Sequence, residues 1–323
     1  MAERLQVIVT RRLPAAAETR LERLFGAEIN RSGEGLTRDA LAAALRRADV
    51  LACSVGDRID SALLEEAGET VRLIANFGVG VDHIDLDAAR AKGIAITNTP
   101  DVLTDDTADI AIALILMVLR RLGEGERLLR EGRWGGWKPT DFLGRALKGR
   151  KLGIVGMGRI GRATARRAAA FGMEIHYHNR NRLPDATEAA HGACWWPELD
   201  AMLPVVDMLS INAPYGVETH RLIDARRLAL MRPDAMLINT ARGGLVDEEA
   251  LIAALESGAL AGAGLDVYPN EPHVDPRLIA LPNTVLLPHL GSATVEARDA
   301  MGEKVVENIL AFAEGRALPD RVV

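Results

Sequence analysis

The chain has 323 residues, of which 48% are hydrophobic, and this length predicts about two domains, each with a full core. Its formal net charge of −6 argues against nucleic acid or an anionic membrane as a partner, because both favour basic surfaces. Cys53 and Cys194 form no C-x-x-C motif, so we expect buried thiols in a reducing compartment rather than a disulfide or a metal site.

The N-terminal segment contains no long apolar run and no cleavage signal, so a cytoplasmic location is the default expectation. The longest apolar stretch, Ile110–Leu119, is too short to span a bilayer. We interpret it as a buried helix at a domain or subunit interface.

Short apolar strands alternate with helices over the first 100 residues. The expected strands are Gln6–Thr10, Val50–Ser54, Leu73–Phe77 and Ile94–Thr99, and the expected helices are Pro14–Phe25, Thr37–Arg47, Asp60–Ala67 and Asp85–Lys92. Such alternation indicates a parallel sheet. This segment is therefore expected to be a small α/β domain that ends near Pro100.

A long apolar helix follows, capped by Thr104, with aspartates in its first turns that suit the helix dipole. The segment Gly123–Leu147 then breaks the periodicity and contains Trp134 and Trp137. We interpret it either as an ordered loop that reaches over another surface or as an ordinary hydrophobic patch on its own domain.

A glycine-rich turn, Gly156-x-Gly158-x-x-Gly161, lies between an apolar strand and the helix Arg159–Phe171. The first glycine of this pattern permits the tight turn, the second admits a pyrophosphate and the third allows close packing of helix on strand. The N–H groups at the start of the helix face the anion. The pattern therefore predicts a dinucleotide site, and the alternative is a plain turn in another α/β domain.

The region that begins with this strand repeats strand and helix. Its expected strands are Lys151–Gly156, Glu174–His178, Met208–Asn212, Ala235–Asn239, Gly262–Val267 and Thr284–Leu287. A final helix, Thr294–Glu314, is long enough to return to the first domain. We therefore expect two Rossmann-like or flavodoxin-like parallel-sheet domains, in which residues 101–288 bind the dinucleotide and are inserted into a substrate domain made of residues 1–100 and 289–323.

The cofactor type is predicted by the stretch that ends the second strand of this region. An NAD enzyme is expected to carry an acidic residue there, whereas this stretch is His178-Asn179-Arg180-Asn181-Arg182. Arg180 and Arg182 are suited to a 2′-phosphate, so we predict a preference for NADP(H). The alternative is that both arginines are solvated and that NAD(H) is accepted as well.

Arg242 and His289 follow expected strand ends, where ligands of such sheets bind, and Glu271 lies in a Pro-Asn-Glu-Pro stretch between them. Arg242 can anchor a carboxylate, His289 can give and retake a proton, and Glu271 can orient a protonated imidazole. Each has an ordinary alternative: a surface arginine, a structural histidine and an exposed acid in a turn. His273 is a rival base.

A resemblance to a known family extends over essentially the full chain. It rests on the stretches NFGVGVDHID (Asn76–Asp85), GIVGMGRIG (Gly153–Gly161), NTARGGLVDEEAL, GLDVYPNEP and LLPHLGSAT. They are similar to the D-isomer-specific 2-hydroxyacid dehydrogenases. TNTPDVLTDDTAD and WGGWKPTDFLG are most similar to the glyoxylate and hydroxypyruvate reductase branch. The resemblance implies that Arg242, Glu271 and His289 are the catalytic residues.

The resemblance implies the roles of Thr107, Trp137 and Asp266, and the glycine-rich turns and expected strand ends indicate the other site residues. The substrate would contact Val55, Gly56, Val79, Gly80 and Arg242, with Trp137 reaching into the partner's site of a homodimer. The cofactor would contact Thr107, Gly156, Gly158, Arg159, Ile160, Gly161, Asn179, Arg180, Arg182, Ala213, Pro214, Thr240, Ala241, Asp266, His289 and Gly291.

The leading hypothesis is an NADPH-dependent reductase of glyoxylate or hydroxypyruvate that yields the D-hydroxyacid. The alternatives are a D-lactate, D-3-phosphoglycerate or larger 2-keto acid dehydrogenase, and a dinucleotide-sensing protein of the corepressor type. Turnover with a ketoacid would separate the enzymes from the sensor.

Overall fold

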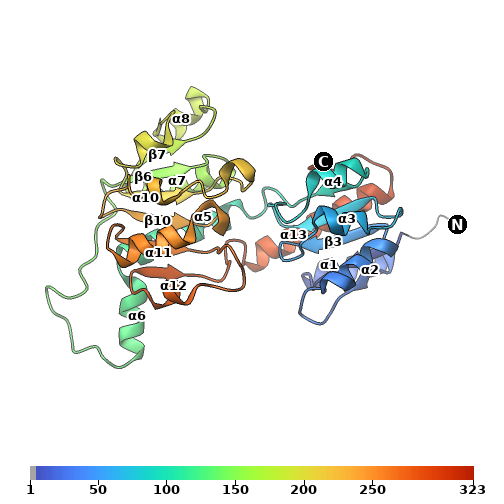
Figure 1. Cartoon of the computed structure of the whole chain (residues 1–323), viewed down its shortest axis with the longest axis horizontal. Coiled ribbons are helices and arrows are strands. Elements are labelled where there is room, and N and C mark those ends of the chain that lie inside the picture. The colour runs from blue at the N-terminus through green and yellow to red at the C-terminus, as the bar shows by residue number, and fades with distance from the viewer. Residues whose placement is uncertain (1–4) are drawn as a thin grey trace. The chain divides into compact units, whose positions relative to one another are not determined.

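The computed structural model describes residues 5–323, which divide into two compact units (Figure 1). The first unit extends to Leu103 and resumes at Thr294, and the second is Thr104–Ala293. The division differs from the predicted one, since residues 101–103 belong to the first unit and residues 289–293 to the second. The latter shift has a physical cause, because the loop that carries His289 is hydrogen-bonded to Asp266 of the second unit.

The first unit is built on a five-stranded parallel sheet with the order β2-β1-β3-β4-β5. Its strands are β1 (Val7–Val9), β2 (Glu28–Ile29), β3 (Val50–Ser54), β4 (Leu73–Phe77) and β5 (Ala95–Thr97). β3 and β4 are mostly apolar and almost entirely buried, because helices cover both faces of the sheet. The four predicted strands are confirmed, whereas β2 was not predicted because it has only two residues.

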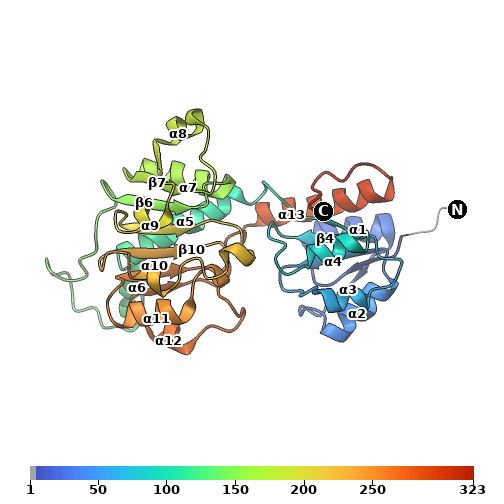
Figure 2. The ribbon, with the colours of Figure 1, turned by 45° about the horizontal axis from the view of Figure 1, so that its top comes forward.

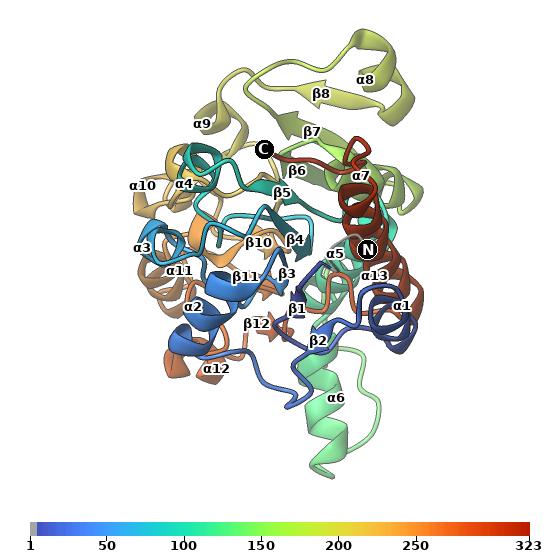
Figure 3. The same ribbon diagram turned by 90° about the vertical axis from the view of Figure 1, so that its right-hand side faces the viewer.

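Helices cover the two faces of this sheet separately. α1 (Ala15–Phe25) and α13 (Val295–Ala313) lie on one face, and α2 (Arg38–Arg47), α3 (Ser61–Glu65) and α4 (Leu86–Ala91) lie on the other (Figure 3). The chain end then adds to the sheet edge, since Val322 N donates to Ile96 O at 2.7 Å. Thr37 and Thr294 precede α2 and α13, and each accepts a backbone hydrogen bond from the first turn of its helix.

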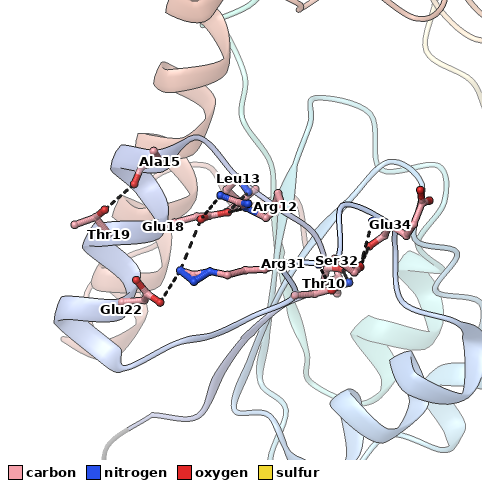
Figure 4. Close-up of polar contacts among 11 residues, drawn as sticks. Thr10, Arg12, Leu13, Ala15, Glu18, Thr19, Glu22, Arg31, Ser32 and Glu34 are labelled. Carbon is pink, nitrogen blue, oxygen red and sulfur yellow. Dashed lines mark hydrogen bonds and ion pairs between the residues drawn. The ribbon is translucent and has the colours of Figure 1, made fainter.

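A buried carboxylate fixes the chain where it leaves β1. Glu18, in the first turn of α1, is 4% exposed and accepts hydrogen bonds from Arg12 Nε and Leu13 N, both at 2.9 Å (Figure 4). Arg31 approaches the same carboxylate at 3.9 Å. Glu18 therefore holds the segment that joins the carboxyl end of the sheet to α1, and it is satisfied there as a buried charge must be.

The second unit contains a seven-stranded parallel sheet with the order β12-β11-β10-β9-β6-β7-β8. Its strands are β6 (Lys151–Val155), β7 (Glu174–His178), β8 (Ala193–Trp195), β9 (Met208–Ile211), β10 (Met236–Asn239), β11 (Gly262–Leu265) and β12 (Thr284–Leu286). The six predicted strands are confirmed, and the edge strand β8 was missed. All seven strands are parallel, and the order in which they are added to the sheet reverses between β6 and β9, so the crevice for a ligand is expected at the carboxyl ends of these two strands.

Two layers of helices enclose this second sheet. α5 (Thr104–Leu119) and α7 (Arg159–Ala170) pack on one face, and α9 (Leu199–Met202), α10 (Ala225–Leu228) and α11 (Glu248–Glu256) pack on the other (Figures 2 and 3). Side chains of the strands alternate between two cores: Leu237 points into one, and Met236 and Ile238 into the other. The second unit also contains α8 (Asp185–His191), α12 (Pro276–Ala280) and the short 3₁₀ turns η1 (Val217–Thr219) and η2 (Gly243–Leu245).

The predicted loop Gly123–Leu147 is wrong in its first part, because Leu122–Arg130 forms the helix α6. Gly123 and Gly125 are weak helix formers and concealed it in the sequence. None of its residues is buried, and the loop that follows leaves Trp137 81% exposed. The expectation for Cys194 is also wrong, since this free thiol is exposed on the edge strand β8, whereas Cys53 is buried.

Within residues 5–323, no helix is both long and apolar enough to cross a bilayer. The cytoplasmic location expected from the sequence stays a prediction.

Candidate functional site

The glycine turn after β6 contains two glycines that the fold itself requires. Gly156 has φ +94°, and a Cβ atom there would lie 2.5 Å from Ala213 N. A Cβ atom at Gly161 would lie 2.3 Å from Gly156 O, so α7 packs directly on the turn. Gly158 differs, because a Cβ atom there would meet no described atom within 4 Å.

Gly158 is also the residue before α7, which has no side-chain cap at this end. Open space therefore lies in front of the N–H groups of α7, where a pyrophosphate is stabilised by these donors and by the helix dipole. The residues present fit a dinucleotide. Arg159 and Ile160 are the first two residues of α7.

The end of β7 is tied to the same turn. Asn179 Oδ1 accepts a hydrogen bond from Met157 N at 2.7 Å, and Gly156 N donates to His178 O at 3.1 Å. Asn179 therefore supports the glycine turn, and the residues after it lie beside the site. Ala213 and Pro214 follow β9 on the other side of β6.

Both arginines beyond Asn179 have carboxylate partners that the sequence analysis missed. Arg180 Nη1 lies 2.8 Å from Glu218 Oε2 in η1. Arg182 donates to both oxygens of Glu188, from Nε at 3.0 Å and from Nη2 at 2.6 Å. Hydrogen bonds from Arg182 and from Tyr177 lower the pKa of Glu188 to about 2. The stretch 178–182 itself contains no carboxylate, as the cofactor prediction stated.

The turn after β10 presents Arg242. Asn239, at the end of the strand, donates from Nδ2 to Arg242 O at 2.9 Å and accepts from Ala241 N at 3.0 Å. A Cβ atom at Gly243 would lie 2.0 Å from Tyr268 C, so this turn packs on the loop after β11. Thr240 lies in the same turn and has a buried hydroxyl with no partner among the described residues.

Glu271 and His289 form a direct pair, with Oε2 2.7 Å from Nδ1. The other carboxylate oxygen accepts a hydrogen bond from Tyr268 N at 3.0 Å. The side chains of Glu271 and His289 keep 34% and 31% of their surface exposed, so the pair is accessible. The backbone N–H of His273, the rival base, donates to Asn270 O at 2.8 Å, and it is His289 rather than His273 that pairs with Glu271.

Two opposing effects set the ionisation of Glu271. Burial on its own would raise its pKa, but the hydrogen bond and charge of His289, with further help from Tyr268 N and Arg242, lower the pKa overall. The carboxylate is therefore ionised beside the imidazole at neutral pH. The turn that contains Arg242 packs on Tyr268, three residues before Glu271, so Arg242 and the Glu271–His289 pair lie on adjacent loops of the second unit.

Asp266 fixes the loop that contains His289, Leu290 and Gly291. This side chain is fully buried and accepts hydrogen bonds from Leu290 N at 2.6 Å and Gly291 N at 2.8 Å. Its carbonyl oxygen accepts from His289 N at 2.9 Å, and His289 adopts φ +56°. Thr107 Oγ1 donates to Gly291 O at 2.9 Å. Contact of Asp266 or Thr107 with a nicotinamide stays a prediction, since both side chains here position the loop.

The first unit contains the predicted substrate-binding turns after β3 and β4. Asn76 Nδ2 donates to the carbonyl oxygens of Gly78 and Gly80 at 3.0 Å, and Asn98 Nδ2 donates to Val79 O at 2.8 Å. The N–H groups of Val79 and Gly80 donate to no other described residue. They are therefore open to a ligand. Val55 and Gly56 follow β3, and Val55 is exposed.

No cluster of three or more His, Cys, Asp or Glu residues in the described part of the chain is arranged to hold a metal ion.

A family model described as "D-isomer specific 2-hydroxyacid dehydrogenase, NAD binding domain" matches residues 112–291. A glyoxylate reductase of Thermococcus litoralis is 44% identical over 98% of this chain and 96% of its own length. The chain belongs to the D-isomer specific 2-hydroxyacid dehydrogenase family. The match over the second unit also supports a nicotinamide dinucleotide as its cofactor.

Solved structures agree with this assignment. An NADPH-dependent glyoxylate/hydroxypyruvate reductase of Sinorhizobium meliloti, solved with NADP and malonate, has a TM-score of 0.89 and 38% identity, covering 99% of this chain and 97% of that one. A glycerate dehydrogenase of Hyphomicrobium methylovorum is 36% identical over 96% of both chains.

The glycine turn yields a paired prediction. Gly158→Ala meets no atom of the protein, so it should preserve the melting temperature while weakening dinucleotide binding by about tenfold or more, because the methyl group enters the anion's space. Gly161→Ala should lower the melting temperature, because its methyl group collides with Gly156 O. Thermal melts and NADH or NADPH fluorescence titrations measure both quantities. A destabilised Gly158→Ala protein would contradict the assignment of open space at this position.

Proposed function

We propose that the chain reduces glyoxylate or hydroxypyruvate to the D-2-hydroxyacid with a nicotinamide dinucleotide. The observation that carries this proposal is the Glu271–His289 pair at 2.7 Å, in the electrostatic neighbourhood of Arg242. The names of the relatives, glyoxylate reductase and glyoxylate/hydroxypyruvate reductase, support a small 2-keto acid as substrate.

In this proposal Arg242 binds the carboxylate of the ketoacid. A guanidinium stays charged at any working pH and can form two parallel hydrogen bonds with a carboxylate. Asn239 holds the backbone of Arg242, which limits the positions that the guanidinium can reach. In the first unit, the open N–H groups of Val79 and Gly80 are further ligands for substrate oxygens.

His289 is the proton donor in this proposal. Glu271 holds Nδ1, which leaves Nε2–H to give its proton to the carbonyl oxygen as that oxygen becomes an alkoxide. The reduced nicotinamide, when bound, supplies the hydride to the carbonyl carbon. The C=O bond thus becomes H–C–O–H, and in the reverse direction the neutral imidazole takes the proton back.

NADP(H) is the cofactor that the arginine-containing stretch favours. An acidic residue that would repel a 2′-phosphate is missing from residues 178–182, and Arg180 is 83% exposed beside the site. A relative with 38% identity is NADPH-dependent. Because both arginines have carboxylate partners, use of NAD(H) as well remains the alternative.

A homodimer is the assembly that the second unit favours. Exposed apolar side chains gather on α6 and the loop after it, namely Leu122, Leu129, Trp134, Trp137, Phe142 and Leu143. α6 and this loop project from the rest of their unit (Figure 1). Such a patch is typical of an interaction site. We propose that a second copy covers it and that Trp137 approaches the partner's substrate.

Steady-state kinetics test the reaction directly. Hydroxypyruvate and glyoxylate should each be reduced, with kcat/KM for NADPH about tenfold above that for NADH if a charge-assisted hydrogen bond distinguishes them. His289→Ala should lower kcat by about 10²–10⁴-fold, and the matched control His273→Ala should stay near the wild-type rate. Normal turnover by His289→Ala, or no turnover by the wild type with either ketoacid, would overturn the proposal.

Glu271→Gln should change the pH dependence as well as the rate. The amide of Gln carries no charge with which to hold the imidazole, so kcat/KM for ketoacid reduction should fall about tenfold. On the acid side, the wild-type pair is lost as the pH falls through the lowered pKa of Glu271, and this limb should be missing from the variant. Rate–pH profiles of the two proteins provide the measurement, and superimposable profiles would exclude the proposed pairing role.

Sedimentation velocity tests the dimer. The wild type should sediment as a dimer, and Leu129→Asp with Leu143→Asp should dissociate it, because two unpaired charges would be buried in the contact. Leu24→Asp, which places a charge on exposed α1, should remain dimeric. A wild-type monomer, or equal behaviour of the two charge variants, would rule out this surface as the interface.

A further inference from the structure

A charge pair stands at the end of the site where the ribose of a dinucleotide is expected. Arg180 follows β7, and Glu218 belongs to η1 beyond β9, 38 residues later in the chain. β7 and β9 flank β6 in the sheet, so the carboxyl ends of both strands lie on either side of the glycine turn. The Arg180–Glu218 pair, at 2.8 Å, therefore joins the segment after β7 to the segment after β9. Residues of both segments are predicted to contact the cofactor.

The two arginines of this stretch are bound very differently. Arg182 donates twice to Glu188, whose side chain is 11% exposed and also accepts from Tyr177 OH at 2.6 Å. Its guanidinium also stacks on Trp195, 5.7 Å from the ring centroid. Arg182 is thus part of the packing around α8. Arg180 and Glu218, by contrast, keep 83% and 78% of their side chains exposed, so their contact is easily exchanged.

We propose that Glu218 is a specificity-determining residue that competes with the 2′-phosphate of NADP(H) for Arg180. NADP(H) binding requires the arginine to leave Glu218 and pair with the phosphate, whereas the ribose hydroxyl of NAD(H) leaves the pair intact. Glu218 therefore narrows the difference in affinity between the two cofactors. This inference rests on the proposed function, in which Arg180 lies beside the ribose.

The relative strengths of the contacts support an exchange of this kind. A phosphate carries nearly two negative charges and three acceptor oxygens, so it binds a guanidinium better than a single carboxylate does. An exposed ion pair is weak and screened by salt, so Arg180 can leave Glu218 at small cost. Separating Arg180 from Glu218 nevertheless weakens the binding of NADP(H) and not that of NAD(H). This loss of affinity disappears when Glu218 loses its charge.

Direct binding measurements test the inference without turnover. NADPH and NADH are titrated by nicotinamide fluorescence into the wild type, Glu218→Gln, Arg180→Ala and the double variant. Glu218→Gln should bind NADPH about two- to fivefold more tightly, and the affinity for NADH should stay nearly the same. The gain should vanish in the Arg180→Ala background, because no arginine is then released. Glu314→Gln, which breaks an exposed pair with Arg316 in the first unit, is the control for net charge.

The outcomes separate this inference from the proposal on which it rests. If Arg180→Ala weakens NADPH selectively while Glu218→Gln has no effect, the competition is refuted and the NADP(H) preference stands. If the gain from Glu218→Gln persists without Arg180, Glu218 repels the phosphate directly and the competition is refuted. If Arg180→Ala leaves NADPH binding unchanged, both the competition and the assigned role of Arg180 are refuted, while ketoacid reduction is judged by its own assay.

Discussion

The candidate active site depends on a buried carboxylate that contacts no substrate in the proposed mechanism. Asp266, at the end of β11, accepts the N–H groups of Leu290 and Gly291, and its carbonyl oxygen accepts that of His289. Burial raises the pKa of Asp266, and these two side-chain hydrogen bonds partly offset that cost. Without them, His289 would have little reason to hold a left-handed conformation, which a non-glycine residue rarely adopts. Asp266 therefore fixes the backbone position of His289, and with it the distance between His289 and Glu271.

The sequence was sufficient to predict those parts of the fold that are encoded locally. β3, β4 and β7 were predicted to the residue, because β3 and β4 are short, mostly apolar runs and β7 alternates polar residues with Ile175 and Tyr177. β2 and β8 were missed because edge strands of two and three residues have no room for a pattern. α6 was missed for a different reason. Its two glycines argue against a helix, and none of its residues is buried, so its sequence lacks the regular apolar stripe that a core-facing helix requires.

The candidate site could be predicted from the sequence only in part. Strand ends indicated where Arg242 and His289 would lie, but the Pro-Asn-Glu-Pro stretch resembles an exposed turn, and only the family resemblance selected Glu271. The structure adds the physical reason for that choice, a contact between residues 18 positions apart in the chain. The partners of Arg180 and Arg182 were beyond sequence reasoning altogether. No local rule links Arg180 to a glutamate 38 residues away on another strand end.

Three carboxylates of the second unit differ in burial, and their roles differ accordingly. Asp266 is fully buried, has backbone donors on both oxygens and serves as a fixed support. Glu271 is one-third exposed, and its hydrogen bond to His289 lowers its pKa and keeps it ionised. It can therefore hold the imidazole while that ring exchanges a proton with the substrate. Glu218 is largely exposed, so its bond to Arg180 is weak enough to be exchanged for a stronger anion. A buried pair in place of Glu218 and Arg180 would resist that exchange, because separating buried charges leaves each without a partner. Because the Arg180–Glu218 pair is exposed, Arg180 can pair with Glu218 when no cofactor is bound and can still move to a phosphate when NADP(H) binds.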